Sequence, residues 1–288
     1  MKNIKIHDVR AVSGDSAFLL DDGSTSVLYD TGFAFTGYAV ADNIKRVLGE
    51  RPLDFIFLTH SHYDHALGSA YVKKRYPCAK IVAGEYAAKI FAKPTARAVM
   101  RELDQKCALS HGITQYEDLI DSLCVDLPVQ DGDTVAAGDM TFSVVSLPGH
   151  TKCSVGFYLR ENKLLLGTET LGVWAGDGVV VPSYLVGYGI AMESIERAMD
   201  MEIDRILVPH FGILEGEDAK RYLQNGKRSA RETAEEILAI LRDGGTDEDA
   251  FAHFKNKFYH GYVTEIYPLD AMTLNTNIMI GLIKKELM

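Results

Sequence analysis

The sequence predicts an α/β fold, organised as one large domain or two small ones. Its 288 residues suffice for either arrangement, and 47% apolar with 24% charged residues is typical of a soluble globular protein. Short apolar runs that suit strands alternate with amphipathic stretches that suit helices. A loop rich in histidine directly follows one of these strands, and it indicates a metal site.

The net charge of −10, from 30 basic and 40 acidic residues, indicates which partners to expect. A field of this sign repels phosphate backbones, so we expect no nucleic-acid partner. No apolar run reaches the length of a membrane span, and residues 1–8 alternate like a strand, unlike an export signal. We therefore expect a cytoplasmic protein without a membrane partner. The cysteines lack C-x-x-C spacing, which favours free thiols; they are Cys78, Cys107, Cys124 and Cys153.

The loop at 59–65, Thr-His-Ser-His-Tyr-Asp-His, is the strongest functional signal. It follows an apolar run at 55–58 that is typical of a buried strand. Three imidazoles and a carboxylate there would lose solvation without compensation unless they bind a cation. The first two histidines share one face of an extended chain, and a tight turn can bring the last two polar residues back towards them. A histidine-rich surface turn is the disfavoured alternative. The candidate ligands are His60, His62, Asp64 and His65.

The pattern His-x-His-x-Asp-His resembles the motif of the metallo-β-lactamase superfamily. The resemblance covers roughly residues 10–215 and implies an αββα sandwich, in which two mixed sheets pack face to face with helices outside. It divides the chain into a metallo-β-lactamase-like domain at 1–214 and an α-helical C-terminal extension at 215–288. The extension resembles those that cap the pocket in glyoxalase II and the quinolone-response protein. Its helical patterns lie near 216–241, 247–260 and 268–287.

The first strands are expected as a meander within residues 3–31. Strands at 17–20 and 26–30 flank Asp-Asp-Gly-Ser, which is a hairpin signal. The second strand ends at Asp30, in an Asp-Thr-Gly sequence that resembles the superfamily's Asp-x-Gly. The Asp30 carboxylate either accepts the N–H of a ligating histidine or caps the following loop, and both alternatives are open. An amphipathic helix is expected at 38–49.

Helical patterns continue after the histidine-rich loop. A helix is expected at 66–76 and a short strand at 80–83. Residues 85–124 are rich in helix and exceed a plain strand connection, which makes them a candidate wall of the active site. We interpret His111, beside a glycine, as a helix-end histidine and not as a ligand.

Alternating patterns resume with strands at 134–136 and 140–145. The second strand runs into Pro-Gly-His-Thr, which resembles the superfamily's Gly-His-Thr-x-Gly-Ser loop and makes His150 a ligand. Cys153 stands where the superfamily has a small residue. We interpret it as a packed thiol, with a metal ligand or a nucleophile as the alternatives.

A strand pair at 155–166 leads to Glu169, where the superfamily has an aspartate that bridges two metals. The longer side chain either reaches both metals after a backbone adjustment or binds only one of them. Asp177 is the fallback ligand, although it lies well past the strand end. A strand at 205–208 leads to His210, which resembles the superfamily's final histidine and becomes the last ligand.

Carried over position by position, the resemblance implies two divalent metal ions. One would be held by His60, His62 and His150. The other would be held by Asp64, His65 and His210, with Glu169 bridging or leaning on both. Nitrogen and oxygen donors without an assured thiolate suit zinc, iron and manganese alike, and zinc is our first expectation.

Such a metal pair would lower the pKa of a bridging water and polarise a carbonyl or phosphoryl group. The hydroxide would attack, while a metal or a nearby tyrosine holds the oxyanion. Asp64 is the candidate for moving the proton to the leaving group. Tyr184 and Tyr188, in the apolar segment 179–189, are the candidate tyrosines, with ordinary loop packing as the alternative. We therefore interpret the chain as a metal-dependent hydrolase of a small ester, thioester or lactone.

Other functions stay open to different degrees. An antibiotic β-lactamase is disfavoured because those enzymes are secreted, and a flavodiiron oxidoreductase because it has glutamate where this chain has His62. A persulfide dioxygenase with a single iron ion stays open because of the altered residue Glu169. From a different class, a regulator could fold around its metals and act by binding a partner. Assembly as a homodimer is also left open.

Overall fold

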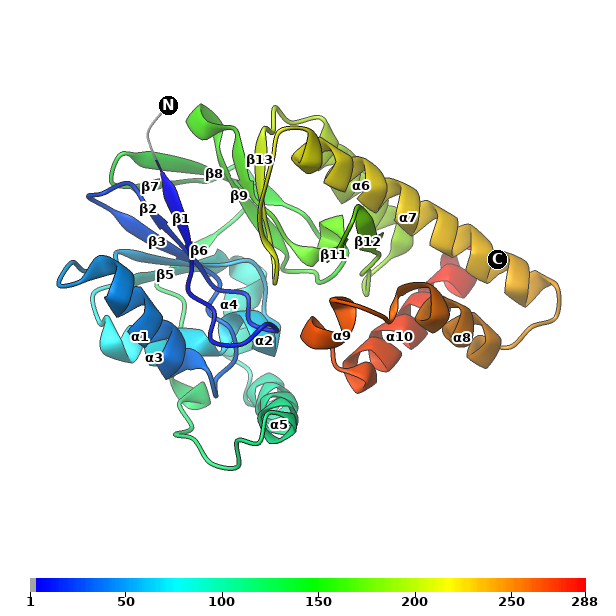
Figure 1. Cartoon of the computed structure of the whole chain (residues 1–288), viewed down its shortest axis with the longest axis horizontal. Helices are drawn as coiled ribbons and strands as arrows, with labels where there is room; N and C mark the ends of the chain where they lie inside the picture. The colour runs from blue at the N-terminus through cyan, green and yellow to red at the C-terminus, as the bar shows by residue number, and fades with distance from the viewer. Residues whose placement is uncertain (1–3) are drawn as a thin grey trace.

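Two six-stranded mixed sheets pack face to face with helices on both outer sides in the computed structural model, which describes residues 4–288 (Figure 1). The predicted αββα sandwich with an α-helical C-terminal extension is thereby confirmed. The part of the predicted N-terminal strand that falls on residues 1–3 lies outside the described residues. Within residues 4–288, no helix has both the length and the apolar character needed to cross a membrane.

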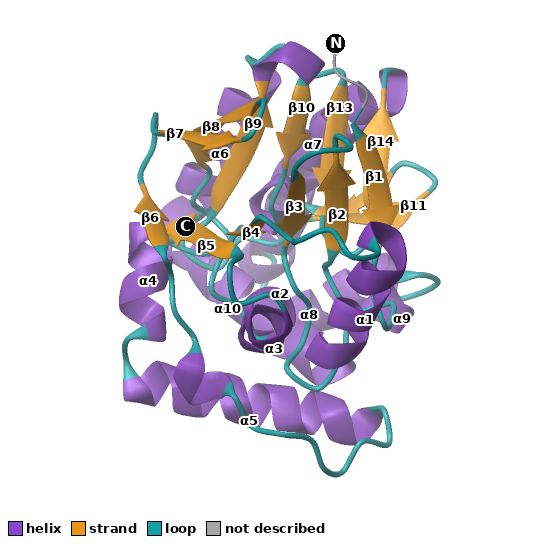
Figure 2. Cartoon of the chain, turned by 90° about the vertical axis from the view of Figure 1, so that its left-hand side faces the viewer, coloured by secondary structure: helices purple, strands orange, loops and turns teal. Residues whose placement is uncertain are grey.

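The first sheet is antiparallel over its first three strands and parallel over the rest. Its order is β1 (Lys5–Asp8), β2 (Phe18–Asp21), β3 (Ser26–Tyr29), β4 (Phe55–Leu58), β5 (Lys80–Gly84) and β6 (Leu127–Val129). The helices of this half are α1 (Gly37–Leu48), α2 (Tyr63–Ala66), α3 (Gly68–Arg75), α4 (Glu85–Phe91) and α5 (Pro94–Ser110), followed by the 3-10 turn η1 (Ile120–Ser122). Figure 2 shows α5 lying furthest from the sheets. His111 directly follows α5 and its Nδ1 lies 2.9 Å from the carbonyl oxygen of Cys107, as expected of a helix-end histidine.

The second sheet is antiparallel except for one parallel pair, β10 with β13. Its order is β14 (Gly212–Glu215), β13 (Arg205–Val208), β10 (Leu164–Leu166), β9 (Val155–Leu159), β8 (Met140–Ser146) and β7 (Thr134–Ala137). A separate hairpin, two 3-10 turns and one helix complete this half: β11 (Val173–Gly176), β12 (Val179–Val181), η2 (Arg160–Asn162), η3 (Glu169–Leu171) and α6 (Tyr188–Met199). The short strands β6, β11, β12 and β14 have no counterpart among the predicted strands.

The core explains why β4 is apolar at every position. Phe57 points between the sheets, where its ring centroid lies 5.1 Å from that of Phe142 and 4.5 Å from that of Phe157. Ile56 and Leu58 point to the opposite face, where they pack with residues of α1 and α3. Because both faces of the strand are buried, the strand shows a continuous apolar run and no alternation. The strand that precedes the histidine-rich loop is thus held rigidly in the centre of its sheet.

The C-terminal helices are α7 (Glu217–Arg242), α8 (Asp247–Phe258), α9 (Val263–Ile266) and α10 (Leu269–Leu287). They pack with α6 and the second sheet in one apolar cluster. At Gly226 of α7, an added Cβ would lie 2.4 Å from the carbonyl oxygen of Leu171, so only glycine permits this approach. The Tyr222 hydroxyl, one helical turn earlier, donates to the carbonyl oxygen of Gly172 at 2.6 Å. The helix therefore supports the η3 turn, while the domain boundary at 214/215 stays a prediction.

A buried carboxylate on α5 generates a prediction about stability. Asp104 is fully buried and accepts hydrogen bonds from the Ala34 N–H at 2.8 Å and from the Tyr116 hydroxyl. Burial outweighs these hydrogen bonds and raises the pKa of Asp104 from 3.8 to about 6. The folded state therefore binds this proton more tightly than the unfolded state does, and stability falls as pH rises through this window.

We expect the free energy of unfolding of the parent, measured by urea titration, to fall between about pH 4 and pH 6 relative to that of Asp104→Asn. The difference should amount to about 3 kcal/mol, because a raised pKa converts at about 1.4 kcal/mol per tenfold change in proton affinity. The amide keeps the size of the side chain and cannot titrate. Subtracting the pH profile of the variant from that of the parent therefore removes the effect of all other titrating groups. Parallel pH profiles for the two proteins would contradict the raised pKa of Asp104.

Candidate metal centre

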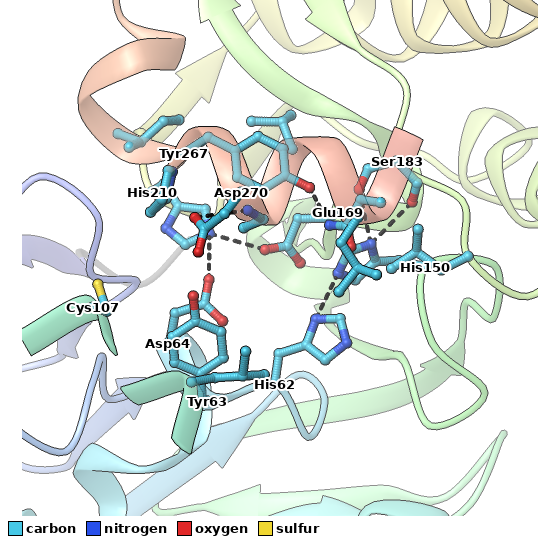
Figure 3. Close-up of a pocket in the computed structure, with 18 of the residues that line it drawn as sticks. His62, Tyr63, Asp64, Cys107, His150, Glu169, Ser183, His210, Tyr267 and Asp270 are labelled. Atoms are coloured by element: carbon cyan, nitrogen blue, oxygen red, sulfur yellow. Dashed lines mark hydrogen bonds and ion pairs between the residues drawn. The ribbon is translucent and has the colours of Figure 1, made fainter. Parts of the chain in front are cut away.

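Four loops at one edge of the sandwich bring all seven predicted ligands together, and Figure 3 labels His62, Asp64, His150, Glu169 and His210 among them. These loops follow β4, β8, β10 and β13, whose ends meet at the same edge. The donors fall into overlapping groups whose ligand atoms lie within 4.8 Å of one another. These groups are His60, His62 and His150; His60, His65 and Glu169; and Asp64, His65 and His210.

The first group consists of three neutral imidazoles. His62 Nδ1 lies 2.9 Å from His150 Nε2, and His60 Nε2 is buried beside them. Burial lowers the pKa of His62 to about 4 and that of His150 to about 3, and it holds the pKa of His60 well below its usual range. The neutral form carries the free nitrogen lone pair that a metal needs.

The second group combines two histidines with an aspartate. The Asp64 Oδ2 atom lies 3.6 Å from His65 Nε2 and 3.7 Å from His210 Nε2. Burial alone would lower the pKa of His65, but Glu169, Asp64 and Asp30 together raise it well above its usual range. This part of the cluster therefore favours a positive charge, which a divalent cation would provide.

Glu169 lies where the two groups meet. Its Oε1 atom is 3.0 Å from His210 Nε2 and 2.6 Å from His65 Nε2, the latter as an ion pair outside hydrogen-bond geometry. Although burial opposes ionisation, His65, His60 and His210 hold the pKa of Glu169 well below its usual range. The 3-10 turn η3 begins at this residue and places the longer side chain. Asp177, the fallback ligand, lies at the exposed turn of the β11–β12 hairpin, outside the groups.

Hydrogen bonds fix the orientation of the imidazoles. The Asp30 Oδ2 atom lies 2.8 Å from His65 Nδ1, so the first of the two alternatives for Asp30 is confirmed. The rings of His60, His150 and His210 are held in the same way by oxygens of the surrounding loops. These contacts join His60 Nδ1 to Thr59 Oγ1 at 2.9 Å, His150 Nδ1 to the Ser183 carbonyl at 3.0 Å and His210 Nδ1 to the Gly14 carbonyl at 2.9 Å. Such contacts select the tautomer that leaves Nε2 for the cluster.

The backbone at His210 is strained and is held from outside the loop. Its φ of 62° lies in the left-handed region that favours glycine. The carbonyl oxygen of His210 accepts a hydrogen bond from the Tyr262 hydroxyl at 2.5 Å and another from the Arg10 guanidinium. The C-terminal extension therefore contributes to the position of this histidine.

The buried polar atoms show that the cluster fits divalent cations. Three of them have no hydrogen-bond partner among the described residues: His60 Nε2, His65 Nε2 and Glu169 Oε2. Leaving such atoms unsatisfied costs free energy, and a bound cation would satisfy all three. Cys153 lies outside these groups. Its thiol is buried, with Sγ 3.3 Å from Ser61 Oγ, which agrees with the interpretation of Cys153 as a packed thiol.

A cavity of about 450 Å³ opens onto the cluster, a size typical of small-molecule sites. Tyr63 and Tyr267 line it, whereas Tyr184 and Tyr188 are not among its described lining residues. Tyr184 is 1% exposed, and its ring lies 5.6 Å from that of Tyr188. Tyr63 lies within the histidine-rich motif, where its position could have suggested a role. Tyr267 belongs to the C-terminal extension, and no motif in the sequence marks it.

Comparisons with known proteins agree with this geometry. The family model described as Metallo-beta-lactamase superfamily matches residues 11–210, which is more than half of the chain. A Caenorhabditis elegans protein named Beta-lactamase-like protein 2 homolog is 24% identical over 243 residues, covering 81% of this chain. A hydroxyacylglutathione hydrolase of Bradyrhizobium is 30% identical over 116 residues, covering 40% of this chain. These alignments span 67% and 33% of the two relatives' own lengths.

The similarity extends to solved structures. The crystal structure of a metallo-beta-lactamase family protein from Thermus thermophilus superposes with a TM-score of 0.66 at 21% identity. The superposition covers 99% of this chain and 94% of that chain. It therefore includes the C-terminal helices as well as the sandwich, and it shows a shared fold.

The position of Glu169 between the two groups generates a prediction about metal binding. We expect two ions per chain in the parent, measured by elemental analysis. Glu169→Asp keeps the charge and shortens the side chain, so the variant should keep the fold. Its affinity for one ion should fall by about 10–100-fold, measured by chelator competition. Glu169→Gln removes the charge and should weaken binding further.

Asp177→Asn is the matched control, because it removes a carboxylate from the exposed hairpin turn. It should bind both ions with parental affinity. Parental affinity in both Glu169 variants would show that Glu169 is not a ligand. One ion or none in well-folded parent, after growth with metals supplied, would contradict the dinuclear assignment.

Proposed function

The chain belongs to the metallo-β-lactamase superfamily, and from this premise we propose that it is a dinuclear metal-dependent hydrolase of an ester, thioester or lactone. The observation that carries the proposal is a buried cluster of seven nitrogen and oxygen donors at the inner end of a small-molecule cavity. His60, His62 and His150 would hold one ion, Asp64, His65 and His210 the other, and Glu169 lies between them. Zinc is the first choice, with iron and manganese as alternatives.

The bound ions would lower the pKa of a water molecule and polarise the scissile carbonyl group. Asp64 is half-buried at the cavity, where its carboxylate can take the proton of the attacking water and pass it to the leaving group. The Asn275 side chain donates a hydrogen bond to the Tyr267 hydroxyl and orients it. Burial raises the pKa of Tyr267, so its hydroxyl keeps a proton that it can donate to the developing oxyanion.

The two complete groups of donors favour this proposal over a single-iron oxygenase, because a mononuclear site would leave one group of buried ligands unused. The relative named hydroxyacylglutathione hydrolase supports thioesters as one substrate class. Glutathione itself carries two carboxylates, whereas Lys106 is the only lysine or arginine among the described residues that line the cavity. We therefore propose substrates without several negative charges.

Hydrolysis and its dependence on metal test the proposal directly. Protein of known metal content, assayed with a panel of esters, thioesters and lactones, should turn over at least one class. Treatment with a chelator should abolish turnover, and added zinc, iron or manganese should restore it. Two bound ions without turnover of any class would instead favour the regulatory alternative.

We further propose that the C-terminal extension completes the metal centre and is not a detachable domain. Tyr262→Phe removes the hydroxyl that donates to the His210 carbonyl and leaves the ring in place. We expect the fold to persist and the affinity for one metal ion to fall by about tenfold, because the strained loop loses part of its support. Chelator competition measures this affinity.

Tyr259→Phe removes a hydroxyl from the same extension without touching His210 and is the matched control. It should bind both ions as the parent does. Equal metal affinity in the parent and in both variants would show that the extension does not support this ligand.

A further inference from the structure

The cavity above the metal cluster has two long walls from distant parts of the chain. One wall is a face of α5 and the other a face of α10, which passes behind the labelled residues in Figure 3 while Cys107 marks α5 at its edge. The apolar wall residues recur at the spacing of one helical face. They are Leu103 and Cys107 on α5 and Ala271, Leu274 and Ile278 on α10.

The helix α10 carries apolar side chains on two faces. Met272, Met279 and Ile283 are buried in the core, as a helix packed on a domain requires. Leu274 and Ile278 face the cavity and are 55% and 37% exposed. Large exposed apolar side chains that gather at a cavity indicate a binding surface. The second face therefore fits an apolar occupant.

The charges at the walls do not fit an anionic occupant. Lys106 Nζ lies 2.8 Å from Glu102 Oε1, so its charge is already paired on α5. Asp270 at the start of α10 adds a negative charge to the lining. Burial raises the pKa of Cys107 to about 12, so the thiol on the α5 wall stays neutral. A neutral, apolar group is the occupant that these walls accept.

We propose that the walls of α5 and α10 bind the acyl chain of the substrate, an unbranched alkyl chain of about six to ten carbons. The inference rests on the proposed function, since the metal cluster at the inner end places the scissile carbonyl there. In the reaction the oxygen of water bonds to the acyl carbon and the C–O or C–S bond breaks. The proton from water passes to the departing alcohol or thiol, and a carboxylic acid is released.

The length of the α10 wall sets the expected length of the acyl chain. Ala271 and Ile278 are separated by about 10 Å along the helix, at roughly 1.5 Å per residue. An extended alkyl chain advances by about 1.3 Å per carbon, given C–C bonds of about 1.5 Å. About eight carbons therefore span this length of the wall, and further carbons extend beyond it.

Kinetics with p-nitrophenyl esters of straight-chain acids, from acetate to tetradecanoate, test the chain length. We expect kcat/KM to rise about threefold per methylene up to about eight carbons, because each methylene leaves water, and then to level off. A flat or falling profile, with the acetate ester turned over, would overturn the acyl-chain site. The proposed hydrolase function would survive that result.

Two glutamine variants test where the acyl chain of the substrate binds. Leu274→Gln places a polar group in the proposed wall and should lower the octanoate-to-acetate ratio of kcat/KM by at least about tenfold. Leu109→Gln is the matched control, since Leu109 is 60% exposed on α5 and is not among the described residues of the cavity wall. Its ratio should equal that of the parent. An unchanged ratio in Leu274→Gln would overturn the site.

Calorimetric titration with octanoate and acetate gives a readout that does not depend on turnover. Octanoate should bind at least about 50-fold more tightly, and Leu274→Gln should reduce that preference. If no ester, thioester or lactone were turned over but the preference held, the acyl-chain site would stand and the hydrolase proposal would fail. Absence of the preference would overturn the site, as would a dimer, seen by sedimentation, that covers this face and dissociates in Leu274→Gln.

Discussion

The burial of Glu169 among histidines is the constraint on which the rest of the site depends. A carboxylate in an apolar interior is destabilised unless positive charge or hydrogen bonds surround it. Here His65 and His210 approach one oxygen of the carboxylate, while the other oxygen has no hydrogen-bond partner among the described residues. The buried Nε2 atoms of His60 and His65 also have no hydrogen-bond partner among the described residues. A bound divalent cation would resolve this arrangement, because it would satisfy oxygen and nitrogen donors together and balance the negative charge.

The surrounding structure keeps these donors in place from several directions. Asp30 orients His65 from the end of β3, and its own backbone has a φ of 51°, in the left-handed region. On the other side, Gly226 lets α7 approach the turn that begins with Glu169. Tyr262 and Arg10 hold the strained backbone of His210. Strain of this kind persists only where neighbouring contacts determine the conformation, and here those contacts come from both ends of the chain.

The same C-terminal helices connect the metal cluster with the space for a substrate. Tyr267 precedes α10 and lies beside the ligands in Figure 3, and the face of α10 that carries Leu274 and Ile278 lines the same cavity. The apolar wall and the metal cluster thus belong to one cavity with a polar inner end and an apolar outer part. Such a division suits a substrate whose reactive carbonyl and apolar tail lie at opposite ends.

Local patterns along the chain were enough to predict several parts of this protein. The apolar run of β4 followed by His60–His65, and the strands before His150, Glu169 and His210, could be predicted because buried strands and polar strand ends leave regular signals. The α-helical C-terminal region was predictable from its periodicity. The short strands β6, β11, β12 and β14 were not, because they lie at sheet edges or in the separate hairpin and are partly exposed, so no continuous buried run marks them.

Which distant residues share the site became clear from the packed chain alone. Tyr184 and Tyr188 follow a ligand strand in sequence, yet the cavity wall takes Tyr267 from the extension in their place. Whether Asp30 would orient a histidine or cap a loop depended on the distance between two strand ends, which no local pattern encodes. The pairing of α5 with α10 across the cavity is of the same kind. Contacts between segments far apart in sequence depend on how the sheets and helices pack, and only the packed chain shows them.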